Sequence, residues 1–209
     1  VFAEKKNISF ISLGSVLNYN HSGECGANGD NVLWKLDSEG NLIIRGSGDM
    51  VDWSSSSTPW YGICRAIKNI SIQEGVTSIG KYAFSNCPNL ESIEIPDSVI
   101  SVGDYAFSNC SNITSVKIPD SVTYIGDSLF YKCTNLKEVT LPSNITEIKN
   151  DTFEYCTNLS NITIPDNVNR IGYGAFAHCS SLKSVNIPEN VCDIYTSFLN
   201  CSSLENITV

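Results

Sequence analysis

A 23-residue step runs through most of the chain and constrains its fold more than any other feature. Cysteine recurs at this step through five units, with a sixth 22 residues further on, and phenylalanine keeps the same spacing. The positions are Cys87, Cys110, Cys133, Cys156, Cys179 and Cys201 for cysteine, and Phe84, Phe107, Phe130, Phe153, Phe176 and Phe198 for phenylalanine. Apolar positions at a fixed period of roughly 20–50 residues are typical of solenoids, whose units bury their apolar faces only against neighbouring units. The sequence therefore predicts a solenoid, with one residue lost between Ile194 and Phe198.

The repeat frame extends backwards into a degenerate half-repeat. One step before Cys87 stands Cys64, and one step before Phe84 stands Tyr61, with Trp60 at the position of Ala83. We therefore divide the chain in two. Residues 1–58 form an N-terminal strand and a capping β-hairpin segment, and residues 59–209 form the solenoid, with a half-repeat, about six repeats and a terminal strand.

Each unit contains one clear strand signal. "LESIEIP" alternates apolar and polar residues, and Pro96 ends the pairing because proline lacks an N–H. A second extended piece ends at Gly103, and "DYAFSNC" has the spacing of one helical turn. Because equivalent strands must stack side by side, the fold class is α/β, a right-handed solenoid with a parallel sheet on one face. We expect the strands to centre on Ile70, Ile93, Val116, Val139, Ile162, Val185 and Ile207.

A hairpin is expected to cover the N-terminal end of the solenoid. In "VLWKLDSEGNLIIRG" two alternating apolar runs flank the turn cluster Asp37–Asn41. We expect its apolar side to be formed by Trp34, Leu36, Leu42 and Ile44, and the joint to the repeats by Trp53, Trp60 and Tyr61. The segment "FISLGSVL", at residues 10–17, is predicted to add one more strand.

Charge excludes two classes of partner. The chain has 13 Lys and Arg residues against 22 Asp and Glu, a net charge of −9, and the basic residues do not cluster. Binding to nucleic acid or to an anionic membrane surface needs a basic footprint, which this chain lacks. No apolar run approaches the roughly 20 residues of a membrane-spanning helix, so membrane insertion is not expected.

Nine cysteines raise the question of disulfide bonds. Seven of them share one repeat position, Cys64 included, so their side chains point the same way at the interstrand step of ~4.8 Å. A disulfide needs Cβ atoms about 3.5–4.5 Å apart that face each other. We interpret this column as small buried apolar side chains, with Cys25 and Cys192 outside it. An exposed Cys192 is the candidate for an intermolecular bond.

No motif indicates catalysis, a metal or a cofactor. His178 precedes Cys179, but a column that points the sulfur inward points its neighbour outward, which disfavours a Cys–His nucleophile. Asp97, Asp120 and Asp166 follow proline as turn formers. We therefore expect no enzyme activity, no catalytic residue, no metal site and no cofactor.

The repeat resembles the leucine-rich repeats, and among them the BspA-like surface-protein family. The resemblance covers about residues 23–209 and rests on "IPDSV", "IGKYAFSNC", "IGDSLF" and "IGYGAFAHC", together with the capping segment "CGANGDNVLWKLDSEGNLIIRGSGDM". Proline after the strand, and the lack of the usual asparagine ladder there, set the repeat apart from the commoner leucine-rich form. The resemblance implies a secreted or cell-surface bacterial protein that binds host or matrix molecules.

The outward strand positions are the candidate binding residues, because they stand in two rows to which every repeat contributes. They are Glu94, Lys117, Thr140, Thr163 and Asn186, with Ser92, Ser115, Glu138, Asn161 and Ser184 in the second row. Two functions remain open: an adhesion module that binds an extracellular protein or glycan through this face, or a structural spacer with no ligand of its own.

Overall fold

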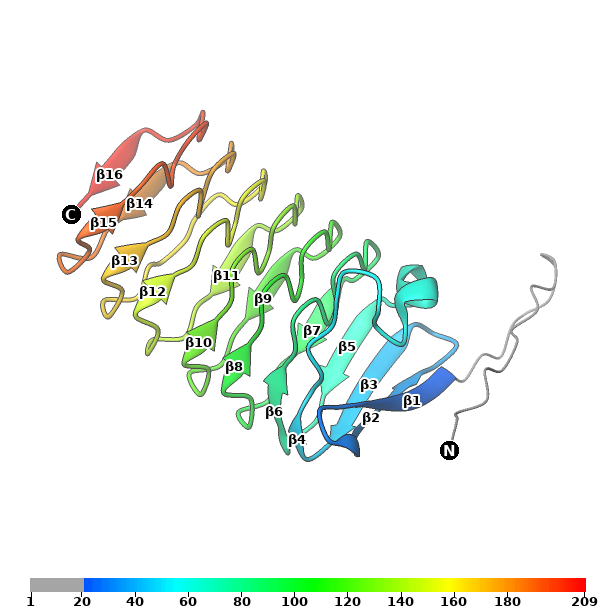
Figure 1. The fold of residues 1–209 in the computed structure, drawn as a ribbon. Helices are drawn as coiled ribbons and strands as arrows, with labels where there is room; N and C mark the ends of the chain where they lie inside the picture. Colours follow the sequence, from blue (N-terminus) through cyan, green and yellow to red (C-terminus); the bar gives the residue numbers. More distant parts are fainter. Residues whose placement is uncertain (1–20) are drawn as a thin grey trace.

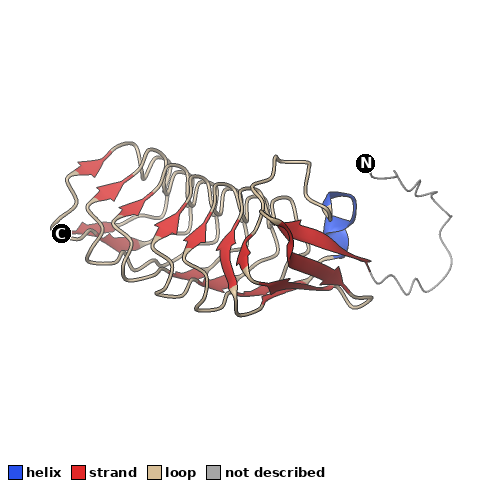
Figure 2. Ribbon diagram, turned by 60° about the horizontal axis from the view of Figure 1, so that its bottom comes forward, coloured by secondary structure: helices blue, strands red, loops and turns tan. Residues whose placement is uncertain are grey.

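The computed structural model describes residues 21–209, which form a solenoid joined at its N-terminal end to a β-hairpin (Figure 1). The strand expected at residues 10–17 lies outside the described residues. Each repeat contributes up to two short strands, which stack on their equivalents in neighbouring repeats as two columns (Figure 2). The register repeats with the sequence, with Ile70 opposite Ile93 and Val116 opposite Val139 in parallel pairs. The parallel solenoid predicted from the 23-residue step is confirmed.

The repeat strands and the short β4 strand of the cap form these two columns. The first column contains β5 (Asn69–Ile72), β7 (Ser92–Glu94), β9 (Ser115–Lys117), β11 (Glu138–Thr140), β14 (Ser184–Asn186) and β16 (Asn206–Thr208). The second column contains β4 (Gly48–Asp49), β6 (Val76–Ile79), β8 (Ser101–Val102), β10 (Tyr124–Ile125), β12 (Glu147–Ile148), β13 (Arg170–Ile171) and β15 (Asp193–Ile194).

The strand expected around Ile162 does not form. Residues 161–164 follow the same course as their equivalents, but no main-chain hydrogen bond joins them to either neighbouring repeat within the described chain. Ile162 still points into the core, with 9% of its surface exposed. Apolar packing is therefore kept where the main-chain hydrogen bonds between strands are lost.

A second break in the first column separates β7 from β9, which contact each other without pairing as strands.

Consecutive turns replace the helical turn expected after each strand pair. Tyr105 and Asn109 have φ angles of 56° and 59°, in the left-handed region, which interrupts a right-handed helix. Every second main-chain N–H group of these turns donates to a carbonyl of the next repeat. The N–H of Phe107, for example, donates to the carbonyl of Leu129 at 3.0 Å. Within residues 21–209 the only helix is the 3₁₀ helix η1 (Tyr61–Ala66), and the fold is mostly β.

A stack of aromatic rings forms the centre of the core. Neighbouring rings have centroids 5.2–5.7 Å apart and planes within 15° of parallel. The members of this aromatic spine are Trp60, Phe84, Phe107, Phe130, Phe153, Phe176 and Phe198. The alignment of Tyr61 with Phe84 is thus wrong by one residue. The 3₁₀ helix η1 replaces the usual turns there, so Trp60 enters the spine and Tyr61 lies 48% exposed.

The expected hairpin consists of β2 (Gly29–Leu36) and β3 (Asn41–Gly46), with β1 (His21–Gly26) antiparallel to β2. All four residues expected on its apolar side are buried. Besides covering the end, the hairpin extends the sheet, because β3 pairs in parallel with β5. Trp34 closes the spine by packing edge-on against Trp60 at 5.6 Å. Trp53 is partly buried against the same core.

A ladder of side-chain oxygens runs beside the second column. Asp104 Oδ1 accepts the N–H of Asp127 at 3.1 Å, and Asp127 Oδ1 accepts the N–H of Asn150 at 3.0 Å. Asn150 Oδ1 in turn accepts the N–H of Tyr173 at 2.9 Å. Asp104 and Asp127 follow the glycine of the repeat, and Asn150 follows Lys149 at the equivalent position, whereas the usual leucine-rich ladder follows the strand. They satisfy main-chain donors at the start of each turn.

Candidate functional site

All ten predicted binding residues are exposed, eight of them on strands of the first column and the other two, Asn161 and Thr163, on the unpaired segment 161–164. The pleat of the strands is the cause, because residues on either side of a buried position point to solvent. Val116, Val139 and Val185 point inward between them, with 3–5% of their surface exposed. We call this surface the repeat face, defined by Ser92, Glu94, Ser115, Lys117, Glu138, Thr140, Asn161, Thr163, Ser184 and Asn186.

Register aligns these residues in rows where strands pair. Ser115 lies opposite Glu138, and Lys117 lies opposite Thr140, in the pair formed by β9 and β11. At the other end of the face, β14 pairs with β16, and Asn186 Oδ1 accepts a 2.8 Å hydrogen bond from the Thr208 hydroxyl. The predicted rows of side chains are therefore aligned within each strand pair. They are interrupted where neighbouring strands do not pair.

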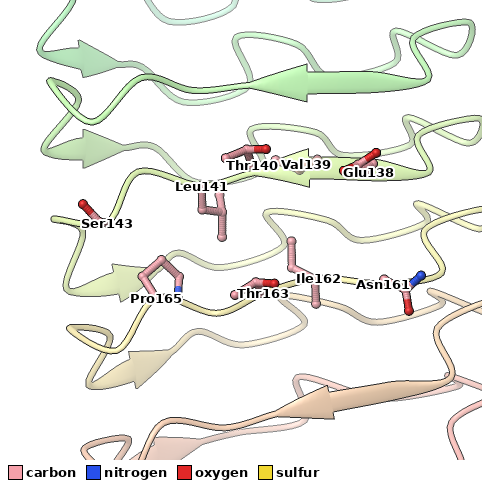
Figure 3. Close-up of a pocket in the computed structure, with 9 residues that line it drawn as sticks. All are labelled: Glu138, Val139, Thr140, Leu141, Ser143, Asn161, Ile162, Thr163 and Pro165. Atoms are coloured by element: carbon pink, nitrogen blue, oxygen red, sulfur yellow. The ribbon is translucent and has the colours of Figure 1, made fainter.

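A hollow of about 420 Å³ opens at the break between β11 and residues 161–164 (Figure 3). Glu138, Thr140, Asn161 and Thr163 form its polar rim, so four of the ten predicted residues meet here. The remaining lining residues, which the sequence analysis did not select as binding residues, are Val139, Leu141, Ser143, Ile162 and Pro165.

The floor of this hollow is apolar and slightly exposed. Val139, Leu141 and Ile162 have 5%, 8% and 9% of their surfaces exposed, more than most core positions in the other repeats. Because residues 161–164 pair with neither neighbouring repeat, their main-chain N–H and C=O groups keep their hydrogen-bonding capacity. The hollow thus offers an apolar contact surrounded by hydroxyl, amide, carboxylate and main-chain groups.

A second hollow, of about 380 Å³, lies on the same face next to the hairpin. Glu94 and Ser92 line it. A chain of hydrogen bonds crosses it, from the Ser92 hydroxyl to Asn69 Oδ1 at 2.7 Å, and from Asn69 Nδ2 to Asn41 Oδ1 at 3.0 Å. Asn41 Nδ2 then donates to Asp37 Oδ2 at 2.9 Å. These side chains satisfy one another, and the lining of this hollow is more polar than that of the first.

The cysteine column is a packing element of the core. All nine cysteines are free, and Cys110 Sγ donates to the carbonyl of Phe84 at 3.2 Å. The equivalent contact, from a cysteine thiol to the carbonyl of a spine phenylalanine, recurs at 3.0–3.2 Å in the following repeats. The thiols are those of Cys133, Cys156, Cys179 and Cys201. Burial raises the pKa of Cys110 to about 12. At neutral pH such a thiol is neither a nucleophile nor a metal ligand.

The ends of the column depart from the expected burial. Cys64 and Cys201 are half-buried, because each has a complete repeat on one side only. Cys192 is exposed, as its position outside the column predicts, and Cys25 is buried in the cap.

His178 and Cys179 do not form a pair. The imidazole stacks on the ring of Tyr155, with centroids 4.2 Å apart, while Cys179 Sγ donates to the carbonyl of Phe153 inside the core. Within residues 21–209, no group of three or more His, Cys, Asp or Glu side chains is placed to hold a metal ion. The same part of the chain contains no helix with the length and apolar character needed to cross a membrane.

Comparison with known proteins identifies the repeat. The BspA type leucine rich repeat region matches in six copies, over residues 57–159 and 146–209. The structure is similar to a leucine rich cell surface protein of Faecalibacterium prausnitzii A2-165, with a TM-score of 0.50 and 17% identity over 85% of this chain and 93% of that one. A leucine-rich repeat protein of Eubacterium ventriosum ATCC 27560 has a TM-score of 0.43 and 19% identity over 91% of this chain and 85% of that one.

A leucine-rich repeat protein of T. pallidum has a TM-score of 0.47 and 22% identity over 77% of this chain and 91% of that one. These structural likenesses concern the fold alone. A search of curated protein sequences finds no relative. The family model covers the solenoid from its half-repeat to its last strand, and this chain belongs to the BspA type leucine-rich repeat family.

Proposed function

We propose that this chain is a non-enzymatic binding module, secreted or displayed at a bacterial cell surface, that binds an extracellular protein or glycan through the repeat face. The observation that carries the proposal is the hollow between β11 and residues 161–164. It combines an apolar floor, a polar rim and unpaired main-chain groups on the repeat face.

The family supports this function. Leucine-rich repeats are typically interaction surfaces without enzyme activity, and one structural relative is described as a cell surface protein. The rigid stack of repeats places many weakly interacting groups side by side. Hydroxyl and amide contacts are individually weak, and the face has no exposed aromatic anchor of the kind that dominates tight interfaces. We therefore expect modest affinity for a single chain, strengthened when many copies act together on one surface.

Binding to immobilised fibronectin, collagen and mucin, measured by surface plasmon resonance, tests the proposal. Thr163→Arg places a long side chain at the hollow and is expected to weaken binding at least tenfold. Thr146→Arg, an exposed threonine outside the repeat face, is the matched control and should bind as the unchanged chain does. Glu94→Lys and Glu138→Lys should each alter the affinity and its salt dependence.

Two results contradict the proposal. If none of the three probes binds, the chain acts as a spacer toward these molecules. If binding survives Thr163→Arg and both charge reversals but is lost in Trp53→Ala, the recognition site lies in the cap.

A further inference from the structure

A third hollow lies where the cap meets the repeats, and none of its lining residues belongs to the repeat face. Its volume is about 480 Å³, within the range of small-molecule sites. It is built from the helix η1, at the capped end of the solenoid in Figure 1, and from the turns of the next two repeats. Neither the family nor the repeat pattern assigns a role to it.

The apolar part of this hollow comes from two rings. Tyr61, displaced from the spine by Trp60, has 48% of its surface exposed, and Pro88 is also part of the lining. An exposed tyrosine ring offers an apolar face together with a polar hydroxyl. The C–H face of a pyranose sugar packs on such a ring, while its hydroxyls need hydrogen-bonding partners around the edge.

Arg65 supplies positive charge at this hollow. It stands four residues after Tyr61, in the last turn of η1, and no acidic side chain within residues 21–209 pairs with it. Its carbonyl accepts a 2.7 Å hydrogen bond from Asn89 Nδ2, which ties the end of η1 to the first full repeat. In a chain of net charge −9, an unpaired guanidinium in a hollow is available to a ligand carboxylate, which it binds in a bidentate geometry.

Two asparagines, one repeat apart, complete the polar lining. Asn86 and Asn109 have φ angles of 60° and 59°, a conformation that asparagine tolerates well. Each Nδ2 donates to the hydroxyl of the preceding serine, Ser85 or Ser108, at 3.1 Å. These bonds fix the amide planes and leave both Oδ1 atoms available to accept ligand hydroxyl groups.

Gly62 keeps the space above η1 open. A Cβ at this position would meet no atom within 4 Å, and its φ is not in the left-handed region. Neither backbone strain nor packing requires glycine here. Because Gly62 itself lines the hollow, a larger side chain at this position can be added there without a clash at its Cβ.

We propose that this hollow, between Tyr61, Arg65, Asn86 and Asn109, is a binding site for an acidic sugar. The sugar ring packs on Tyr61 and Pro88, its carboxylate pairs with Arg65, and its hydroxyls donate to the asparagine amides. This site is independent of the repeat face and of the function proposed for it.

Isothermal titration calorimetry on the full chain tests the proposal with four soluble probes. A tetrasaccharide of glucuronic acid and N-acetylglucosamine and a sialyllactose carry carboxylates, whereas chitotetraose and lactose are their neutral counterparts. We expect at least one acidic probe to bind at least tenfold more tightly than its neutral counterpart. Which of the two binds distinguishes a uronic acid from a sialic acid.

Variants connect that preference to the hollow. Arg65→Ala should lose at least tenfold in affinity and Arg65→Lys less, while Gly62→Leu should abolish binding with an unchanged melting temperature. Arg45→Ala, an exposed arginine on β3, and Thr163→Arg on the repeat face should leave the affinity unchanged. No preference for either acidic probe, or an equal loss in Arg65→Ala and Arg45→Ala, overturns the proposal. If Arg65→Ala fails to fold, Gly62→Leu alone decides the question.

Discussion

The indole of Trp60 stacks on the ring of Phe84, with centroids 5.6 Å apart and planes 15° from parallel. Its Nε1 also donates a 2.8 Å hydrogen bond to the carbonyl of Ala83. Trp60 thus occupies, in the half-repeat, the place that phenylalanine holds in later units. Since Trp34 packs against its other side, one aromatic stack connects the cap to the repeats.

This arrangement predicts that two adjacent aromatic residues differ sharply in their effect on stability. Trp60→Ala should lower the free energy of unfolding by about 3–5 kcal/mol, as loss of a buried aromatic side chain does. Tyr61→Ala should change it by less than about 1 kcal/mol, because the ring is half-exposed. Urea unfolding followed by circular dichroism gives both values. If Tyr61→Ala lowered the free energy of unfolding more than Trp60→Ala does, Tyr61 and not Trp60 would be the equivalent of Phe84.

The loss of stability on removing a phenylalanine ring should depend on its position along the aromatic spine. Phe130 is fully buried between Phe107 and Phe153, whereas Phe198 stacks on one ring only, that of Phe176, within the described residues. We expect Phe130→Ala to cost about 3–5 kcal/mol and Phe198→Ala clearly less, because the terminal unit has one neighbour. Parallel denaturation curves of the two variants provide the comparison. Equal losses would mean that another segment packs on the end of the array.

The ladder of side-chain oxygens can be tested at Asp127. Asp127→Ala leaves the N–H of Asn150 without its acceptor, and such a loss costs about 1–3 kcal/mol. Asp127→Asn keeps an Oδ1 acceptor and should retain most of the stability. Hydrogen exchange should show faster exchange of the Asn150 amide in the alanine variant only. Similar behaviour of both variants would mean that the ladder contributes nothing at this position.

Accessibility of the thiols should follow their place in the column. Brief alkylation of the folded chain with iodoacetamide, read by mass spectrometry, should modify Cys192 first. Cys64 and Cys201 should follow slowly, and Cys110, Cys133 and Cys156 should react only after unfolding. Urea-unfolded chain, in which all nine react, is the control. Early labelling of Cys110, or a disulfide between Cys110 and Cys133, contradicts the packed column.

The buried thiols also predict a loss of stability at alkaline pH. Burial raises the pKa of Cys110 to about 12, whereas an unfolded cysteine titrates near ~8.5. Between these values the unfolded chain releases a proton that the folded chain keeps, so stability is full below about pH 8.5 and falls above it. The slope is about 1.4 kcal/mol per pH unit for each such thiol.

Urea midpoints between pH 8 and pH 10.5 measure this slope. Cys110→Ser retains a donor for the Phe84 carbonyl but has no thiol to titrate, so its slope should be smaller by one proton. Cys192→Ser, which removes an exposed thiol outside the column, is the comparison variant. Identical slopes in all three proteins would contradict the assignment.

The 23-residue step was sufficient to predict the parallel solenoid and the buried column of thiols. Translation by one unit places like residues over like, so Phe107 must lie over Phe84 and Cys110 over Cys87 once the units are parallel. Alternation around Val116 and Val139 likewise predicted which side chains face solvent. The hairpin was readable because its turn cluster separates two alternating runs.

The candidate sites depended on departures from that symmetry, which sequence spacing does not contain. The segment "NITIP" around Ile162 has the same pattern as "SVKIP" around Val116, yet only the latter pairs as a strand. The aromatic spine, the turns and the oxygen ladder together set the distance between neighbouring repeats. A strand of three residues pairs with its neighbour only where that distance suits main-chain hydrogen bonds. Packing between repeats likewise placed Trp60, and not Tyr61, in the aromatic spine. The sequence by itself determined the repeated architecture, and packing between units decided where it opens, because a hollow depends on the small mismatch between neighbouring coils.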